Sequence, residues 1–403
     1  MSSRCFASVA TVLALAGCTG NDTRPVAARS RPTAAQTAAG VPAPASSSLD
    51  LGCGVGDCPT ASAPTGLFEG RLLAYATHGF SRAELTSVTA HVTGPVTAVY
   101  STEQTLRGTE AAFPLTPVAT LLVDAASYAA AAGRPTLGDN LTGGVVIAAT
   151  EAELRKQAVG DTVTLSDGRT FPITAVVPDQ VLGGYEMASS DQVLTVPATQ
   201  PAAYLLVGGM AGVPALQAML KAQLPTRTVR VRSRTANGFL SSYDTVLTQL
   251  EIKRRFGEFS LKPAAAGAFV PDTTWINTWI RTRTITQLGP VECNKAILPD
   301  LEAAMKEVTA DKLGSLIDTA DFQYEGGCFA PRVARLSDGG SVSAHSWGIA
   351  VDINVKNNPL GAKPHQDTRL VAIMSKHGFT WGGHWLRPDG AHFEWVGTAL
   401  SKP

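Results

Sequence analysis

Five of the seven histidines in this chain of 403 residues lie between positions 345 and 392, and two short segments of this region stand out. One segment runs Ser343-Ala-His-Ser-Trp-Gly-Ile-Ala-Val-Asp352, and the other runs Asp389-Gly-Ala-His392. A catalytic zinc site takes three protein ligands from histidine, aspartate or glutamate and keeps a fourth position for water. His345, Asp352 and His392 supply such a set, so the fold has to bring two separate segments together.

The first segment is not expected to form one continuous helix. Gly348 interrupts it, and the β-branched residues Val351 and Ile353 favour a strand. The pattern therefore predicts a loop bearing His345 that runs into a strand bearing Asp352.

Asp389 is the candidate general base. It precedes His392 by three residues, which allows it to lie beside the metal without binding it and to accept a proton from the attacking water. Isolated histidines are more often core or surface residues, and His365, His377 and His384 are interpreted in that way.

The joint pattern resembles that of the zinc peptidases that cut bacterial cell-wall peptides, namely the VanY-type D-alanyl-D-alanine carboxypeptidases and the L-alanyl-D-glutamate endopeptidases. The resemblance extends from about Phe256 to Val396. It includes the segments Trp275-x-x-x-Trp279, Gly327-Cys-Phe-Ala-Pro-Arg332 and Gly378-Phe-x-Trp-Gly-Gly383.

This resemblance implies three zinc ligands, which are His345, Asp352 and His392. It makes Asp389 the catalytic base. Arg332 stands where the family often has an arginine that holds a substrate carboxylate or polarises the scissile carbonyl, and Ser343 is a candidate for hydrogen bonding to the substrate. The carboxypeptidase branch commonly has Glu-x-x-His where this chain has Asp-x-x-His, which favours the endopeptidase branch. The implied fold is a small α+β domain whose antiparallel sheet carries the zinc.

The beginning of the chain is typical of an export signal. Arg4 precedes the uncharged, mostly apolar run Phe6 to Gly17, which is shorter than the roughly 20 residues that a membrane-spanning helix needs. The run ends in Leu15-Ala-Gly-Cys18, which resembles the bacterial lipobox, whose cysteine becomes the lipidated first residue of the mature protein. Ordinary secretion is the alternative, and disulfides are permitted in either case.

Residues 19–50 have almost no large apolar side chains and are predicted to form a disordered tether. Four further cysteines form two pairs that are close in sequence. Cys53 and Cys58 would close a short loop at the end of the tether. A bridge between Cys293 and Cys328 would contribute roughly 3 to 4 kcal/mol on the chain-entropy estimate. Zinc binding by these cysteines is disfavoured because neither pair has the two-residue spacing of a zinc knuckle.

The middle of the chain, about residues 60–250, is predicted to be a folded α+β region. The expected elements are a hairpin over Thr162 to Val177 turning at Asp167-Gly168, a strand over Tyr204 to Val207, a helix over Val213 to Leu224 and a strand over Thr228 to Arg232. Residues 152–177 resemble the extracytoplasmic domains of bacterial ABC-type permeases of the MacB kind. The region has only two histidines, His78 and His91, and no clustered carboxylates, so it is interpreted as a binding or spacing module.

The resulting prediction is an α+β protein with a signal segment at 1–17, a tether at 18–58, a separate α+β domain at 59–250 and a zinc peptidase domain at 251–403. The 33 basic and 33 acidic residues give no support for nucleic-acid binding. We expect a peptidase acting on peptidoglycan peptides, held by lipid on Cys18 at the outer face of a bacterial membrane, with an envelope partner for the middle domain. The chemistry is expected to be independent of residues before Phe256. The alternative is an envelope lipoprotein with little catalytic activity whose middle domain binds a partner or a cell-wall component.

Overall fold

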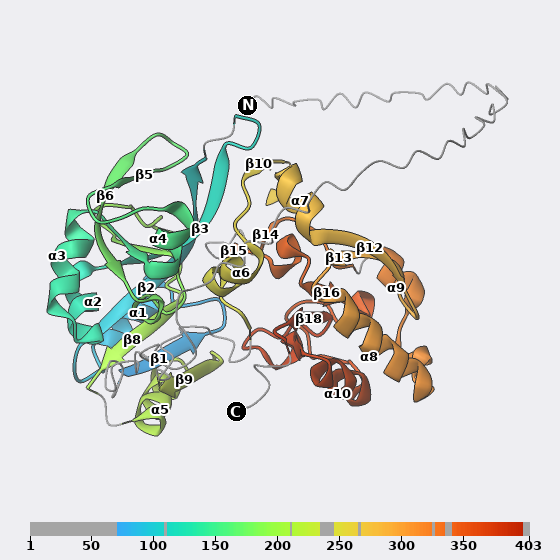
Figure 1. Ribbon diagram of the computed structural model, residues 1–403. Helices are drawn as coiled ribbons and strands as arrows, with labels where there is room; N and C mark the ends of the chain where they lie inside the picture. The colour runs from blue at the N-terminus through green and yellow to red at the C-terminus, as the bar shows by residue number, and fades with distance from the viewer. Residues whose placement is uncertain are drawn as a thin grey trace, which may run out of the picture. The chain divides into compact units, whose positions relative to one another are not determined.

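The computed structural model describes residues 71–108, 111–209, 212–233, 246–264, 267–324, 327–334 and 341–397. The predicted signal segment, the tether, Cys18 and the pair Cys53 and Cys58 lie outside the described residues. Residues 62–403 group into one compact unit. Helices and strands are mixed throughout, as expected for an α+β protein (Figure 1). In the described part of the chain, no helix has the length and apolar character needed to cross a membrane.

A large sheet is built from the first half of the unit. Its strands are β1 (Arg71–Ala76), β2 (Val96–Arg107), β3 (Leu115–Val123), β4 (Val145–Ala148), β5 (Thr162–Thr164), β6 (Thr170–Val177), β7 (Met187–Ser190), β8 (Tyr204–Gly208) and β9 (Val229–Ser233). They lie in the order β5-β6-β4-β7-β3-β2-β8-β1-β9. The pairs β3–β7 and β4–β6 are parallel, and the other neighbours in this order are antiparallel.

The helices of this half are α1 (Arg82–Thr89), α2 (Ala125–Ala132), α3 (Pro135–Gly143), α4 (Ala149–Arg155) and α5 (Val213–Gln223). The central strand β3 is buried on both faces because its side chains alternate between two cores. Leu121 and Val123 pack with Tyr128 of α2, whereas Val118 and Leu122 belong to the core on the opposite face. Helices α2 and α3 lie side by side in Figure 1.

The elements predicted in this half are confirmed. The hairpin consists of β5 and β6, with Val163 opposite Phe171. The predicted strand at 204 is β8, the helix beginning at Val213 is α5, and the strand at 228 is β9.

The second half begins with the helix α6 (Gln249–Phe256), followed by β10 (Leu261–Pro263), β11 (Phe269–Pro271), α7 (Thr273–Trp279), β12 (Ile280–Ile285), β13 (Gly289–Asn294), α8 (Leu298–Ala310) and α9 (Thr319–Tyr324). It continues with β14 (Val333–Ala334), β15 (Ser341–Val342), the short 3₁₀ turn η5 (Ala344–Trp347), β16 (Ala350–Asp352), α10 (Thr368–Lys376), β17 (Phe379–Trp381), the 3₁₀ turn η7 (Gly382–His384) and β18 (His392–Trp395). Three small antiparallel sheets result, which are β12-β13, β14-β15 and β16-β18-β17. One core that includes the fully buried Trp347 holds this half together.

Contacts across the predicted boundary near residue 250 are polar as well as apolar. The fully buried Lys253 of α6 forms ion pairs with Glu186 at 2.6 Å and with Glu258 at 2.9 Å. Leu261 of β10 pairs with Leu115 of β3, which joins β10 to the large sheet.

The prediction that the middle region lacks clustered carboxylates is wrong. Glu103, Glu151 and Glu186 interact electrostatically around the buried Lys253. Burial raises the pKa of Glu103 to about 7 and that of Glu186 to about 8, because the charged carboxylate loses its hydration. These residues come from separate elements, so only the folded chain reveals the cluster.

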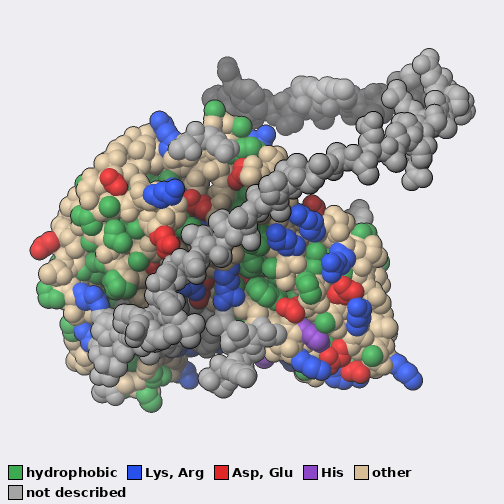
Figure 2. All heavy atoms as spheres, viewed as in Figure 1, with side chains coloured by type: hydrophobic (Ala, Val, Ile, Leu, Met, Phe, Trp, Pro, Cys, Tyr) green, Lys and Arg blue, Asp and Glu red, His purple; other side chains and the backbone are tan. Residues whose placement is uncertain are grey.

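The outer surface carries charges of both signs. Figure 2 shows basic and acidic side chains interspersed over the face in view, without a continuous basic area. This distribution agrees with the balanced composition of the sequence.

Candidate active site

Strand pairing brings the two halves of the site together. Asp352 of β16 and His392 of β18 are direct partners across the antiparallel pair, and Ala350 is opposite Glu394. Directly opposed residues project from the same face of a sheet, as do residues two apart on one strand. The aspartate, the histidine and Glu394 therefore share one face.

His345 reaches this face from the 3₁₀ turn η5. The Ser343 hydroxyl accepts a hydrogen bond from the His345 backbone N–H at 3.4 Å and caps the turn. Gly348 ends the turn in the left-handed conformation, with φ of 64°, and a Cβ there would lie 2.7 Å from the backbone nitrogen of Asn294. The predicted loop-to-strand transition is thus confirmed, with the loop tightened into a turn that only glycine can end at this spacing.

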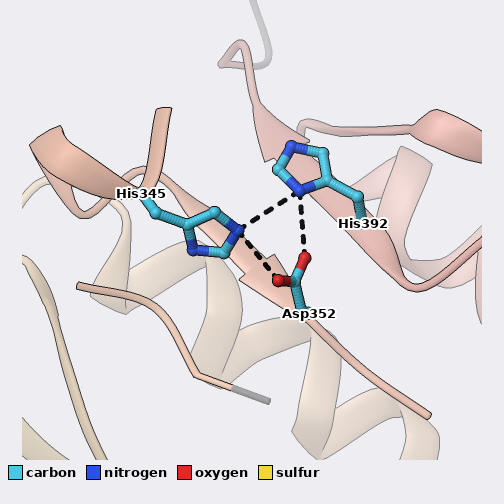
Figure 3. Close-up of side chains that lie close together, drawn as sticks. All are labelled: His345, Asp352 and His392. Carbon is cyan, nitrogen blue, oxygen red and sulfur yellow. Dashed lines mark hydrogen bonds and ion pairs between the residues drawn. The ribbon is translucent and has the colours of Figure 1, made fainter. Parts of the chain in front are cut away.

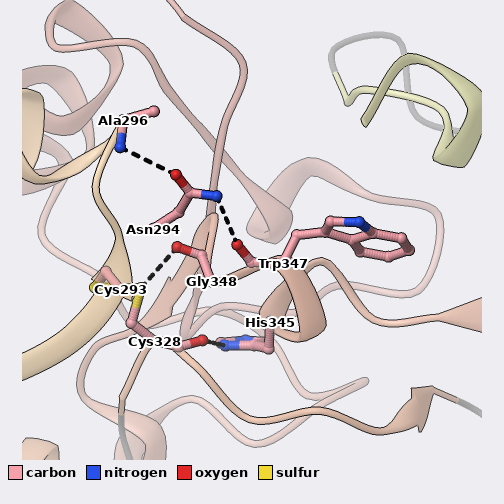
Figure 4. Close-up of a disulfide and its surroundings, with 7 residues drawn as sticks. All are labelled: Cys293, Asn294, Ala296, Cys328, His345, Trp347 and Gly348. Atoms are coloured by element: carbon pink, nitrogen blue, oxygen red, sulfur yellow. Dashed lines mark hydrogen bonds between the residues drawn. A yellow bond between two sulfur atoms is a disulfide. The ribbon is translucent and has the colours of Figure 1, made fainter. Parts of the chain in front are cut away.

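The disulfide predicted between Cys293 and Cys328 is present, with a Cα–Cα distance of 5.3 Å. Figure 4 shows it beside the ring of His345, whose Nδ1 donates to the Cys328 carbonyl at 2.8 Å. A carbonyl only accepts hydrogen bonds, so Nδ1 carries the proton and Nε2 presents its lone pair. The amide of Asn294, next to the bridge, donates to the Trp347 carbonyl at 3.1 Å and supports the same turn.

The three side chains converge on one point (Figure 3). His345 Nε2 lies 3.1 Å from Asp352 Oδ2, and His392 Nδ1 lies 3.0 Å from Asp352 Oδ1. The two imidazole nitrogens are 3.3 Å apart. All three candidate ligand atoms lie within 4.8 Å of one another. Two imidazole nitrogens and one carboxylate oxygen with a fixed tautomer are the donor set that zinc takes in catalytic sites, so the residues fit this metal.

The electrostatics of the cluster show how strongly the three groups interact without a metal. Burial by itself raises the pKa of Asp352, but the neighbouring His345 and His392 outweigh it and hold that pKa well below its usual range. Burial by itself lowers the pKa of His392, but its hydrogen bonds to Asp352 and Glu394 raise it to about 10. A proton on His392 therefore holds the metal-free cluster together, and a metal has to displace it.

The other predicted residues lie around the cluster. Asp389 borders the same cavity as the three candidate ligands, and its backbone carbonyl accepts from the His392 N–H at 3.3 Å. The half-exposed Arg332 has Nη2 at 3.9 Å from Asp352 Oδ2. Ser343 also borders the cavity, although its hydroxyl accepts a hydrogen bond within its own turn.

Glu394 is expected from the sequence to orient the ligands and not to bind the metal or act as the base, and its contacts agree with that role. It is buried, and its Oε2 lies 3.4 Å from Nε2 of His392. This contact engages the ring nitrogen opposite the one that faces Asp352, so Glu394 orients the histidine. The sequence indicates this contact, because His392 and Glu394 are two residues apart on one strand and therefore point to the same face.

The cavity itself has a second wall that the sequence did not predict. The cavity has a volume of about 540 Å³. It is bordered by the cluster and by residues of the first half, among them Tyr75, His78, Glu103 and Tyr204. The expectation that the chemistry is independent of residues before Phe256 is therefore revised.

Asp352 and His392 on the small sheet and His345 on the turn beside it are residue types that bind the metal in hydrolytic sites. Residues 337–395 match the family described as D-alanyl-D-alanine carboxypeptidase. The matched segment contains the three candidate ligands and Asp389, whereas Arg332 lies outside it.

Among solved structures, the chain is similar to the periplasmic region of MacB from Actinobacillus actinomycetemcomitans, with 14% identity and a TM-score of 0.31, over 42% of this chain and 90% of the other. It is also similar to a domain of a protein described as a permease from Porphyromonas gingivalis, with 13% identity and a TM-score of 0.26, over 41% of this chain and 91% of the other. No curated protein sequence gives a significant match.

Proposed function

We propose that this chain is a zinc-dependent peptidase that hydrolyses peptide bonds in the stem peptides of bacterial cell-wall peptidoglycan. The observation that carries the proposal is the convergence of His345, Asp352 and His392, with the closest ligand atoms 3.0 to 3.3 Å apart, within a segment that matches a peptidase family. The complete set of ligands and the adjacent Asp389 favour catalysis over the alternative of an envelope lipoprotein with little activity.

In this proposal His345, Asp352 and His392 hold the zinc ion. A bound zinc ion supplies Lewis-acid activation of water and of the scissile carbonyl. Asp389 accepts a proton from the attacking water at the cavity border and returns it to the leaving amine. Glu394 keeps the His392 ring oriented, so that Nδ1 remains directed at the cluster.

Arg332 supplies positive charge at the edge of the cluster. Its guanidinium lies near the Asp352 carboxylate and is partly exposed, so it is available to a peptide in the cavity. A guanidinium stabilises developing negative charge on a carbonyl oxygen, and its paired donors also suit a carboxylate. Both roles agree with a substrate rich in carboxylates.

The bond that is cleaved is left open between two choices. The Asp-x-x-His spacing favours an L-alanyl-D-glutamate endopeptidase, whereas the matched family is described as a D-alanyl-D-alanine carboxypeptidase. We place the enzyme outside the cytoplasm, attached through lipid on Cys18 to the outer face of a bacterial membrane, with a partner in the envelope for the middle region.

The test uses the chain without its signal segment and purified cell-wall fragments. We expect about one equivalent of zinc per chain, cleavage products detectable by mass spectrometry, and loss of cleavage in the presence of a chelator. His345→Ala and His392→Ala should abolish zinc binding, whereas His365→Ala, at an exposed histidine outside the cluster, should not. Full hydrolysis by metal-free protein would contradict the proposal.

A further inference from the structure

The second wall of the cavity is supplied by strands and loops of the large sheet. Tyr75, Thr77 and His78, at the end of β1 and just after it, border the same cavity as His345 and Asp389. His78 is exposed to solvent and borders this cavity. Among the described residues of the first half, it is the histidine that borders this cavity.

The backbone that carries His78 has an unusual conformation. His78 has φ of 65° and Gly79 has φ of 71°, so two successive residues are left-handed. A Cβ at position 79 would lie 2.4 Å from the carbonyl oxygen of Ala202, which requires glycine there. A non-glycine residue with positive φ is uncommon and persists where the surrounding structure enforces it.

The surrounding structure enforces this turn through Arg227. Its guanidinium donates to the Gly79 carbonyl at 2.7 Å and to the Thr77 carbonyl, on either side of His78. Glu84 forms an ion pair with the same guanidinium at 2.8 Å and so holds it in place. The backbone of the turn is thereby held in one conformation, so a ligand that binds the histidine does not have to order that backbone.

The charges around the cavity indicate which ligand would use this wall. Among the described residues that border it, three of the acidic side chains belong to the cluster and its base, namely Asp352, Asp389 and Glu394, and the fourth, Glu103, accepts from the Gln249 amide at 2.8 Å. In the same described lining, the basic side chains outside the metal cluster are His78, Arg332 and Arg387. The part of the cavity beyond the cluster is thus rich in donors and suits an anionic group.

We propose that His78 binds a carboxylate of the peptide substrate and so makes the middle region a determinant of peptidase specificity. This inference rests on the proposed function, because it assumes that a peptide occupies the cavity. The histidine contributes a hydrogen bond to a charged acceptor, whose loss costs roughly tenfold or more in affinity.

The experiment compares matched peptides that carry either free carboxylates or carboxamides. His78→Gly removes the side chain and tolerates the left-handed backbone. His91→Ala is the control, at an exposed histidine of the same region that does not border the cavity. We expect His78→Gly to raise KM for the carboxylate peptide about tenfold with little change in kcat and to leave the carboxamide peptide unaffected. Equal KM values for wild type and His78→Gly on both peptides would overturn the inference.

A binding measurement separates this inference from the proposed function. Calorimetry with Asp389→Asn protein loaded with zinc, with and without His78→Gly, reports the preference for the carboxylate peptide in the absence of turnover. Loss of the preference in the double variant supports the assignment of His78, and a preserved preference refutes it. If wild type hydrolyses neither peptide while the preference is present and depends on His78, the proposed function fails and the binding site stands.

Discussion

At the scale of single residues, the cluster is organised by Asp352. Each oxygen of its carboxylate reaches one imidazole, at 3.1 Å and 3.0 Å, so one side chain fixes the positions of both histidines. Asp389 and Glu394 flank His392 in sequence but have different surroundings. Glu394 is buried against the His392 ring, whereas Asp389 is partly exposed at the cavity border.

These different surroundings predict different effects of removing the two carboxylates. Asp389→Asn should lower kcat by roughly 10² to 10⁴ while leaving zinc bound, because the residue moves a proton and is not a ligand. Glu394→Gln should be milder, because an amide still hydrogen-bonds to His392. Steady-state kinetics and metal analysis of both variants check this. An active Asp389→Asn protein beside an inactive Glu394→Gln protein would reverse the roles.

Protonation of His392 predicts a proton released on metal binding. The pKa of this histidine is raised from 6.5 to about 10 in the metal-free fold, so the residue is protonated at pH 7 and has to lose that proton when zinc binds. Calorimetric titrations in buffers with different ionisation enthalpies should show release of about one proton. A binding enthalpy that is the same in every buffer would contradict this protonation state.

The same pKa gives the pH dependence of the metal-free fold. Because the folded pKa lies above the unfolded value, the contribution of His392 to stability is complete below pH 6.5 and is lost as the pH rises towards 10. Thermal unfolding of the apoprotein over this range, compared with the His392→Ala variant, isolates the contribution.

At the scale of secondary-structure elements, local patterns were predictable and distant contacts were not. The turn at Gly348 and the strand that follows it are encoded by glycine and β-branched residues within ten positions. Glu103 lies on a strand, Glu186 in the bend before β7 and Lys253 on a helix, so no local sequence pattern predicts their cluster. The left-handed His78 depends on Arg227, which is about 150 positions away.

The disulfide links two elements of the site and predicts an effect on both stability and metal affinity. Cys293→Ser with Cys328→Ser should lower the melting temperature by several degrees, since the bridge closes a long loop in the unfolded chain. Zinc affinity should fall as well, because the Cys328 carbonyl that orients His345 is no longer held. Zinc titration of the double variant checks the second effect, and peptide mapping without reductant that finds both thiols free would contradict the bridge.

At the scale of the whole molecule, the two halves share a buried ion pair and a cavity. Lys253 is fully buried against Glu186, and a chain that starts at Leu250 lacks that partner. Lys253 keeps Glu258 in that chain, but removing one partner of a buried group of charges is destabilising. A chain that starts at Leu250 also lacks the residues of the first half that border the cavity.

A fragment of residues 250–403 should therefore be less stable than the intact unit and have a higher KM for soluble cell-wall peptides. Thermal unfolding and steady-state kinetics of the fragment and of the chain without its signal segment test this. A fragment with the same melting temperature and the same KM as the longer chain would show that the first half contributes nothing to the site.

The direct pairing of Asp352 with His392 also determines which changes in chain length the site tolerates. Successive side chains of a strand point to opposite faces of the sheet. A one-residue insertion between His392 and Phe393 would therefore send the histidine to the opposite face. The long connection from β16 to β17 has no such parity, because only its ends are fixed in the sheet. The loops around this candidate metal site can therefore change in length, whereas the strand through His392 has to keep its number of residues.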